Sequence, residues 1–487
     1  MFKHALIQEA AHESLLKKRR REHNALIARA LEEHFPARAA SEPEVLARHY
    51  EDGGLAGEAI VYYARAGEKA QALCAYEEAV RHLRQASALV AAQPESRERD
   101  AHEAALQLQL AFSSSAIASR GYAQPEVEVA FERARVLCEA IGDSRGLGRA
   151  LDGLAEFSVA SGQMKRAGVL AMKVLAIAER IDDTDMALRG HYELAQSEFY
   201  RGRFASSLRQ CEAALALFEP GRRQVVLPEF PSMDRDVPRL YLSAWSLYEL
   251  GWPDRARDRA REAVVLARAI RHPYSLTSAL VFAAVVDWSR RDVAGQRERA
   301  AEAMAVSETH GFPFWLGVAR TFHASARVAA GELEAVADLV AGVDQSGGTG
   351  TRNAAPGLLG LLGESYIAAG QLSQARRAVE GGLAIGEQTD QSFFDAELHR
   401  LRGEIDLAGG GSADDAEALF QRALEIARTQ EARSYELRTA TSLARLWRDQ
   451  GKLAEARNVL ASVYDWFTEG FDTQDLKDAK ALLEELA

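Results

Sequence analysis

The sequence has few cysteines, no metal-binding motif and no long apolar run. Its 487 residues contain only three cysteines, Cys74, Cys138 and Cys211, and their odd number and wide spacing argue against a disulfide framework and a zinc site. None of the 12 histidines belongs to a His-Glu-x-x-His motif. The longest apolar run, Ser278–Val286, is far shorter than the ~20 residues of a membrane-spanning helix. We therefore expect a soluble, cytoplasmic protein that binds no cofactor, metal ion or membrane.

Proline is also scarce, and the composition favours helices. Only 12 prolines occur, hydrophobic residues make up 47% of the chain, and charged residues make up 27%. Alanine and leucine, which have high helix propensity, outnumber valine, isoleucine and threonine. The composition therefore predicts an all-α protein.

Positive charge is in deficit over the whole chain but not at its start. The formal net charge is −12, which repels phosphate backbones. Residues 1–40 nevertheless hold eight basic and five acidic side chains. Within them lies a basic run that either contacts an acidic partner or is a solvated helix face. We predict a basic interaction patch and expect no general nucleic-acid binding. The patch consists of Lys17, Lys18, Arg19, Arg20 and Arg21.

Glycine recurs at regular intervals of 40, 49, 80, 39, 40 and 41 residues, each time at the end of an apolar segment of helical length. The 80-residue interval splits at Arg291, where flanking alanines keep the spacing of the other repeats. A period near 40 residues is typical of a solenoid, in which each helix pair packs on its neighbours. We expect about ten such pairs and a binding function on a surface. The glycines are Gly162, Gly202, Gly251, Gly331, Gly370, Gly410 and Gly451.

Each repeat has a similar internal pattern. The first apolar and small residues share one helix face, a glycine ends that helix, and later small residues let the second helix approach closely. This pattern matches the tetratricopeptide repeat and predicts a right-handed α-solenoid with a period of ~40 rather than 34 residues. In the clearest repeat the pattern consists of Leu359, Leu362, Gly363, Tyr366, Gly370, Ala375 and Val379.

The repeats divide the chain into three predicted segments. Residues 1–40 are a basic helical remnant, residues 41–142 are a set of N-terminal repeats, and residues 143–487 are the main array. The 49-residue interval contains four of the twelve prolines. This cluster predicts a long surface loop over residues 219–238.

Aromatic residues make up only 8% of the chain, yet they recur along the first helices of the central repeats. In repeats of this kind such positions face the concave groove. Aromatic side chains with polar edges are good anchors for a peptide laid in a groove. Large side chains also fill the space between neighbouring helix pairs, so two interpretations stay open, groove anchors or core residues. The candidates are Tyr192, Phe199, Tyr241, Trp245, Tyr248 and Trp288.

Several segments resemble one protein family. The segments Phe2–Ala11 and Ser14–Arg21 resemble the stretch that follows the P-loop ATPase module in bacterial class III adenylate/guanylate cyclase–ATPase fusion proteins. The resemblance implies that this chain is the C-terminal tetratricopeptide region of such a protein, without the cyclase and P-loop modules. Similar to further landmarks of that region are Gly121–Val127, Leu250–Asp254, His310–Trp315 and Tyr464–Thr473.

These observations favour one function and leave two alternatives. The favoured hypothesis is a non-catalytic scaffold for protein–protein interaction, which by the resemblance is the sensing and regulatory half of a cyclase–ATPase signalling protein. Its partner is then a protein or peptide in the concave groove, or an ATPase or cyclase module acting in trans. One alternative is an enzyme of the cyclase or ATPase type, although a P-loop-like spacing at Gly342 and Gly347 has Gly348 where a P-loop has lysine. The other alternative, a nucleic-acid-linked transcriptional regulator, conflicts with the net charge.

Overall fold

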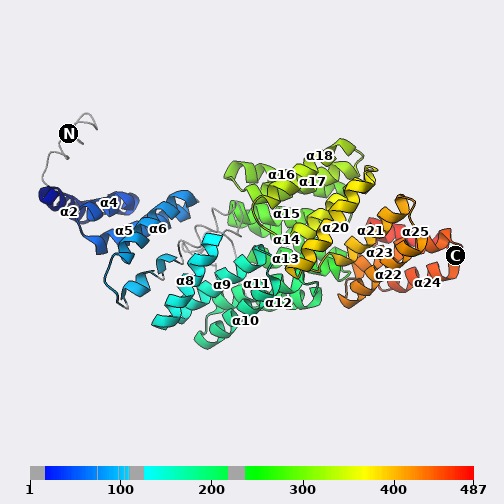
Figure 1. Cartoon of the computed structure of the whole chain (residues 1–487), viewed down its shortest axis with the longest axis horizontal. Coiled ribbons are helices and arrows are strands. Elements are labelled where there is room, and N and C mark those ends of the chain that lie inside the picture. The colour runs from blue at the N-terminus through cyan, green and yellow to red at the C-terminus, as the bar shows by residue number, and fades with distance from the viewer. Residues whose placement is uncertain are drawn as a thin grey trace. The chain divides into compact units, whose positions relative to one another are not determined.

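The computed structural model describes residues 17–73, 75–96, 98–103, 105–107, 109, 125–217 and 236–487. Every regular element within these ranges is helical, which confirms the predicted all-α class (Figure 1). In the same ranges no helix is both long enough and apolar enough to cross a membrane.

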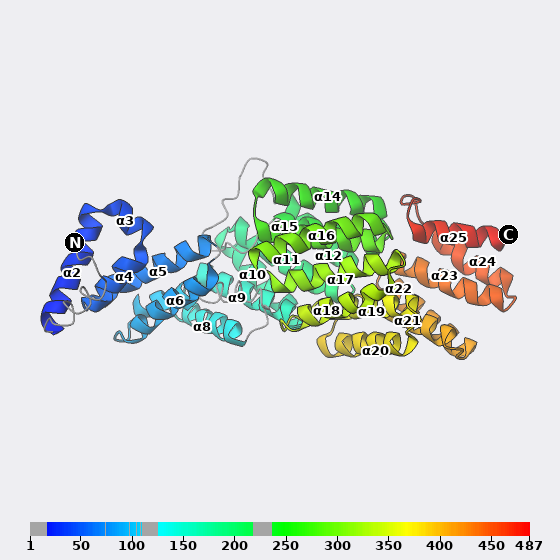
Figure 2. The same cartoon turned by 90° about the horizontal axis from the view of Figure 1, so that it is seen from above.

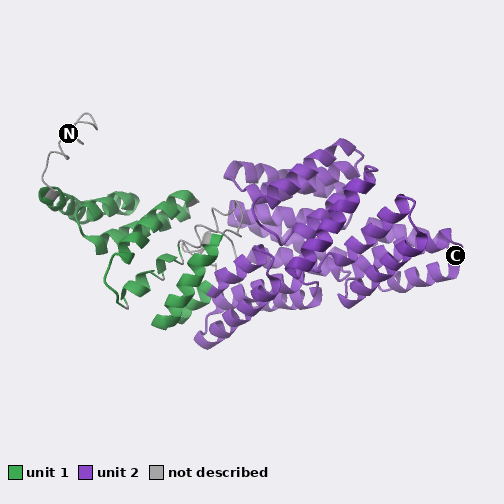
Figure 3. Cartoon of the chain, viewed as in Figure 1, with its two compact units in different colours: residues 1–117, 125–150, 225–231 green, residues 118–124, 151–224, 232–487 purple. Residues whose placement is uncertain are grey.

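The chain forms two compact units (Figure 3). Among the described residues, unit 1 comprises those up to 109 together with 125–150, and unit 2 comprises 151–217 and 236–487. The division falls within one helix, α9 (Ser144–Ala160). The predicted segment boundaries at residues 40 and 142 stay predictions, because the two units differ in their internal contacts and do not mark where a repeat begins or ends.

Unit 1 consists of helices around an apolar core that includes Leu46, Tyr50 and Leu83. The Tyr62 hydroxyl donates a 2.7 Å hydrogen bond to the Glu32 carboxylate, and the Tyr50 hydroxyl donates to the other oxygen of the same group. These two bonds lower the pKa of Glu32 and tie its helix to the two tyrosines. The helices of unit 1 include α2 (Lys17–His34), α3 (Pro36–Ser41), α4 (Pro43–Asp52), α5 (Ala56–Ala72), α6 (Tyr76–Ala91) and α8 (Pro125–Ile141).

Unit 2 is a regular stack of helix pairs followed by α25 (Gln474–Glu485). From α10 onward each helix packs on the next helix along the chain (Figure 2). Alanines at the crossings, such as Ala256 and Ala375, are fully buried and permit this close approach. The fold is therefore a tetratricopeptide-like solenoid, as predicted. Its pairs are α9 with α10 (Met164–Ile181), α11 (Thr184–Tyr200) with α12 (Phe204–Ala216), α13 (Asp236–Glu249) with α14 (Pro253–Ile270), α15 (Pro273–Ser289) with α16 (Val293–His310), α17 (Pro313–Ala329) with α18 (Val336–Gly347), α19 (Ala355–Ala368) with α20 (Leu372–Thr389), α21 (Asp395–Ala408) with α22 (Ala413–Thr429), and α23 (Arg433–Asp449) with α24 (Leu453–Tyr464).

The turn between the two helices of a pair requires a left-handed backbone. All seven glycines of the predicted series have φ between 69° and 94°, a region that a side chain disfavours. Arg291 holds the predicted missing position between α15 and α16, and its φ of 61° shows the same conformation. The prediction that the 80-residue interval contains an extra repeat is thus confirmed. The Arg291 guanidinium also forms an ion pair with Glu364 at 2.5 Å.

The array of unit 2 returns on itself. The backbone N–H of Arg352 donates a 2.7 Å hydrogen bond to the carbonyl of Ala160, and the N–H of Ser392 donates a 2.9 Å bond to the carbonyl of Tyr200. The Ser392 hydroxyl donates to the carbonyl of Arg201, a residue 191 positions earlier in the sequence. Late repeats therefore pack against the turns of early repeats at an offset of close to 190 residues.

The same return contact continues toward the C-terminal end of unit 2. The Arg290 guanidinium, which is buried, forms an ion pair with Asp472 at 3.0 Å and a hydrogen bond to the carbonyl of Pro253. Arg438 forms an ion pair with Asp475 at 2.7 Å and donates a hydrogen bond of the same length to the carbonyl of Ser289. Each of the two arginines thus reaches one acceptor on the other turn of the array, Asp472 for Arg290 and the carbonyl of Ser289 for Arg438.

The return contact separates the turn glycines into two groups. A Cβ atom added at Gly162, Gly202 or Gly251 would lie 2.4–2.7 Å from a side chain of the later turn, at Thr389, Gln430 and Trp466 respectively. A Cβ atom added at Gly331, Gly370, Gly410 or Gly451 would meet nothing within 4 Å. The first group is therefore required both for backbone conformation and for close approach, and the second only for conformation.

Two predicted connections differ from expectation. The predicted loop over residues 219–238 falls mostly outside the described residues, which end at 217 and resume at Asp236. Residues 236–238 form the first turn of α13, so the predicted loop extends three residues too far. The small-residue composition of residues 346–351, Ser-Gly-Gly-Thr-Gly-Thr, predicts a flexible link after α18. Thr349 and Thr351 are nevertheless buried there, and the Thr349 hydroxyl donates a 2.6 Å bond to the carbonyl of Ser346.

Candidate functional site

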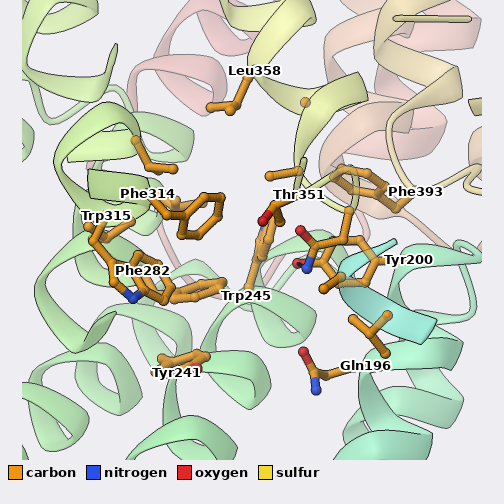
Figure 4. Close-up of a pocket in the computed structure, with 18 of the residues that line it drawn as sticks. Gln196, Tyr200, Tyr241, Trp245, Phe282, Phe314, Trp315, Thr351, Leu358 and Phe393 are labelled. Carbon is orange, nitrogen blue, oxygen red and sulfur yellow. Dashed lines mark hydrogen bonds between the residues drawn. The ribbon is translucent and has the colours of Figure 1, made fainter. Parts of the chain in front are cut away.

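Unit 2 encloses a cavity of about 120 Å³ (Figure 4). Its walls come from the first helices of six consecutive pairs, α9, α11, α13, α15, α17 and α19, and from Phe393 and Phe394 just before α21. Because the array returns on itself, the helix face that would border an open groove surrounds this space instead. The volume is of the same order as the ~150 Å³ of an engineered apolar cavity that holds benzene.

Aromatic rings form half of this wall. The Tyr241 ring stacks on Phe282 with centroids 4.0 Å apart, and Trp245 meets Phe393 edge to face at 5.7 Å. Trp315 meets Phe282 edge to face at 6.2 Å. An edge-to-face pair leaves ring faces that the partner does not cover. The aromatic residues that line the cavity are Tyr192, Tyr200, Tyr241, Trp245, Tyr274, Phe282, Trp288, Phe314, Trp315, Phe322, Phe393 and Phe394.

All six aromatic residues predicted from the sequence are buried, with exposed fractions between 0% and 8%. Exposure on an open groove is therefore wrong for them, because the later turn of the array covers the inner face. Phe199 and Tyr248 do not line the cavity and are core residues: Phe199 packs on Trp245 at 4.4 Å, and the Tyr248 hydroxyl donates to the carbonyl of Ser289. A binding role stays a prediction for the four that line the cavity, Tyr192, Tyr241, Trp245 and Trp288.

The two tyrosines among these four are linked to each other. Their hydroxyl groups lie 3.1 Å apart, which joins α11 to α13 at the cavity wall. Burial raises the pKa of both Tyr192 and Tyr241, so both stay neutral hydrogen-bonding groups. The same effect keeps Tyr200 neutral, and its hydroxyl receives a 3.3 Å hydrogen bond from the Asn353 amide.

Three polar residues that line the cavity are only partly buried. They are Glu156, Gln196 and Asn353, and each retains some exposure to solvent. Within the described part of the chain, no residue donates a hydrogen bond to the Glu156 carboxylate or forms an ion pair with it. Burial and the charge of Asp152 raise the pKa of Glu156 to about 7, although Arg189 opposes the shift.

Further charged groups stand behind Glu156. Arg189 forms an ion pair with Asp152 at 2.9 Å, and Glu193 is buried next to them on α11. Burial, and after it the charges of Asp152 and Glu156, raise the pKa of Glu193. Among the described residues, Arg189 is the guanidinium whose charge acts on all three carboxyl groups, those of Asp152, Glu156 and Glu193. The sequence analysis did not identify any of these residues.

Two polar atoms among the cavity residues have no partner. The indole Nε1 of Trp315 and the amide Oδ1 of Asn353 are inaccessible to solvent, and no described residue forms a hydrogen bond with either. Trp315 as a whole is 92% buried, given its 8% exposed fraction. Buried polar atoms are normally hydrogen-bonded, so a donor and an acceptor are left for a bound molecule or water.

The sequence did hold a signal for part of this wall. Phe314 and Trp315 lie in the His310–Trp315 segment that resembles a family landmark, and Phe282 lies within the longest apolar run. Phe393 and Phe394 precede their helix rather than occupying its groove face, so a search along the first helices could not find them.

The predicted basic patch lies at the start of α2. Lys18, Arg19 and Arg21 are exposed there and Arg20 is half-buried, whereas the Lys17 side chain lies outside the described residues. The binding role of this basic patch stays a prediction. 

The described residues outside the cavity form neither a metal site nor a reactive thiol. No cluster of three or more His, Cys, Asp or Glu side chains there has the geometry of a metal site. Burial raises the pKa of the Cys138 thiol to about 11 and that of the Cys211 thiol to about 12, which keeps both protonated. Cys74 lies outside the described residues.

Comparison with known proteins gives one relative and several similar folds. No protein-family model matches the sequence. An uncharacterized protein of Rhizobium meliloti (strain 1021) is 26% identical over 470 residues, which cover 91% of this chain but 43% of the relative. The chain thus spans less than half the length of the curated relative that it matches.

Three solved structures illustrate the similarity in fold. A Rap protein complexed with competence and sporulation factor has 12% identity and a TM-score of 0.48, over 88% of this chain and 100% of that chain. A chain of the APC/C hetero-tetramer Cut9-Hcn1 has 13% identity and a TM-score of 0.49, over 98% of both chains. A tetratricopeptide repeat protein from Parabacteroides merdae has 15% identity and a TM-score of 0.34, over 58% of this chain and 97% of that chain. The resemblance to cyclase–ATPase fusion proteins stays a prediction.

Proposed function

We propose that unit 2 is a non-catalytic sensing module that binds a ligand, either a free molecule or a side chain of a partner protein, in its aromatic cavity. One observation carries the proposal: the first helices of six consecutive pairs border the same cavity. A ligand there contacts repeats that are far apart in the sequence. It therefore stabilises one arrangement of the array relative to others, which is the requirement for a ligand-controlled switch.

The output of such a switch would be the contact between distant turns. Phe393 lies against the cavity, and its backbone N–H donates a 3.1 Å hydrogen bond to the carbonyl of Tyr200, which also lines the cavity. Two residues that line the cavity, Tyr200 and Phe393, are thus among those that hold the two turns of the array together. Filling the cavity would strengthen this contact.

We further propose that the module regulates enzymatic modules of the cyclase–ATPase type rather than catalysing a reaction itself. The support is the sequence resemblance at Leu250–Asp254, His310–Trp315 and Tyr464–Thr473. The greater length of the Rhizobium meliloti relative leaves room for such modules in that protein. A titration with ATP and Mg²⁺ tests the non-catalytic part, because micromolar binding to this chain would contradict it.

A peptide-display experiment tests cavity binding. Peptides selected from a random library on the purified chain should bind the wild type and Val169→Phe equally, because Val169 is exposed on α10. They should bind Val281→Phe at least tenfold more weakly, because Val281 lines the cavity and is 2% exposed. Circular dichroism of both variants checks that they fold. Equal affinity for the two variants would place binding elsewhere and refute the proposal for a partner side chain.

A further inference from the structure

We propose that the cavity of unit 2 binds an alkylated ammonium group, with aromatic rings around its alkyl groups and Glu156 beside its charge. The inference rests on the proposed function, because it names the ligand chemistry of the same cavity. Choline and a trimethylated lysine side chain share this chemistry, and they represent a free ligand and a partner protein respectively.

The aromatic walls supply the first part of the argument. A cation is attracted to the negative face of an aromatic ring, and tryptophan is the most effective ring for this contact. Trp245, Trp288 and Trp315 all line the cavity and come from three successive first helices. An ammonium ion carrying methyl groups also tolerates loss of water better than a bare ion, because its surface is apolar. A space of about 120 Å³ suits a head group of this size.

The carboxyl group supplies the second part. Glu156 lines the cavity, and no described residue pairs with its carboxylate. The nearby Arg189 guanidinium forms its 2.9 Å ion pair with Asp152 instead. The environment around Glu156 contains Asp152 on its own helix and Arg189 and Glu193 on α11, so acidic groups are in excess. A neutral ligand of the same size without a hydrogen-bond donor would leave Glu156 unpaired. An anionic ligand would be repelled.

The orphan polar atoms supply the third part. Trp315 Nε1 is a buried donor and Asn353 Oδ1 a buried acceptor, both without a partner among the described residues. A hydroxyl group can accept from the first or donate to the second. Choline carries such a hydroxyl group two carbon atoms from its ammonium nitrogen. The cavity residues therefore match a small cation with one polar arm.

The test compares choline with 3,3-dimethyl-1-butanol, which has the same shape but no charge. Isothermal titration of the full chain should show choline binding at least tenfold more tightly than the alcohol. Glu156→Gln should remove this preference, whereas Glu198→Gln, which changes a carboxyl group on α11 that does not line the cavity, should retain it. Equal or tighter binding of the alcohol to the wild type would overturn the inference, and this comparison does not depend on the folding of any variant.

A second measurement uses the protonation of Glu156. Because its carboxyl group has a pKa of about 7 in the empty cavity, a cation should bind more tightly as the pH rises from 6 to 8 and should release protons. Titrations in two buffers of different ionisation enthalpy measure that release. A pH-independent affinity without proton release would contradict a contact between the cation and Glu156.

Four further outcomes separate the ligand sources and the two proposals. Tighter binding of a trimethyl-lysine peptide than of choline identifies a partner protein, and the reverse identifies a free ligand. If selected peptides require an open cavity but neither cation binds at millimolar concentration, the inference fails and the proposed function stands. If peptides and cations both bind Val281→Phe as tightly as the wild type, both proposals fail.

Discussion

Replacement of Gly251 by alanine tests whether the array of unit 2 closes on itself. The backbone at Gly251 has φ 90°, and Gly331 provides a matched control with φ 94°. A new Cβ at position 251 would lie 2.5 Å from the Trp466 ring and 2.8 Å from Cβ of Arg433, whereas the space around position 331 is open. Both replacements incur the same backbone penalty, so their difference isolates the contact between the two turns.

The expected magnitudes follow from these distances. A left-handed backbone costs an alanine roughly 1–2 kcal/mol relative to glycine in both variants. Overpacking of a rigid indole ring adds roughly 1–3 kcal/mol for Gly251→Ala alone. With a shift of about 2–4 °C per kcal/mol for a large domain, Gly251→Ala should melt several degrees below Gly331→Ala.

Thermal unfolding followed by circular dichroism measures this difference, and amide hydrogen exchange locates it. In Gly251→Ala, helices α24 and α25 should exchange faster because Trp466 lies between them. Gly331→Ala should leave the exchange of these two helices unchanged. Equal melting temperatures and equal exchange in the two variants would refute the return contact.

Two buried carboxyl groups give further predictions with opposite dependence on pH. Burial alone would raise the pKa of Glu397, but Arg400 and then Arg438 lower it to about 2. The stability that the Glu397 carboxylate contributes is therefore present above pH ~4.5 and lost as the pH falls toward 2. Glu397→Gln should therefore destabilise the chain by roughly 3–5 kcal/mol at pH 7 in urea unfolding, because the buried Arg400 guanidinium loses its shorter ion pair and keeps only the longer one to Glu404. A loss that persists at pH 2 would contradict this. Burial raises the pKa of Glu249 to about 8, so its contribution declines as the pH rises from ~4.5 through 8. Glu249→Gln should raise the melting temperature more at pH 8.5 than at pH 5.5, and an equal effect at both would show that Glu249 is already ionised.

The sequence was sufficient for the local parts of the fold. Helix length, the small residues at crossings and the turn glycines act within one repeat, so the period predicted every pair of unit 2. Even the left-handed turn at Arg291 could be located, because its neighbours kept the spacing. These features depend on contacts within about forty residues.

The closure of the array could not be predicted in the same way. The bond from the Ser392 hydroxyl to the carbonyl of Arg201 spans 191 residues, and its existence depends on small rotations summed over successive pairs. No local pattern distinguishes Gly202, which meets the later turn, from Gly370, which does not. Four of the six predicted aromatic residues do lie on the helix face that borders the cavity, because helical periodicity is local. Their burial was missed because it depends on the later turn of the array, which no local pattern reveals.

The offset near 190 residues has a consequence for changes in repeat number. An open solenoid tolerates the gain or loss of an internal repeat, because each unit recognises only its neighbours. Here the insertion of one 40-residue pair between Ala160 and Arg352 would shift each later repeat by one helix pair relative to the early repeat that it now contacts. The shift would also separate the two halves of the cavity wall. Whole-repeat duplication, the usual way in which such arrays lengthen, is therefore compatible with this fold only outside the closed turn.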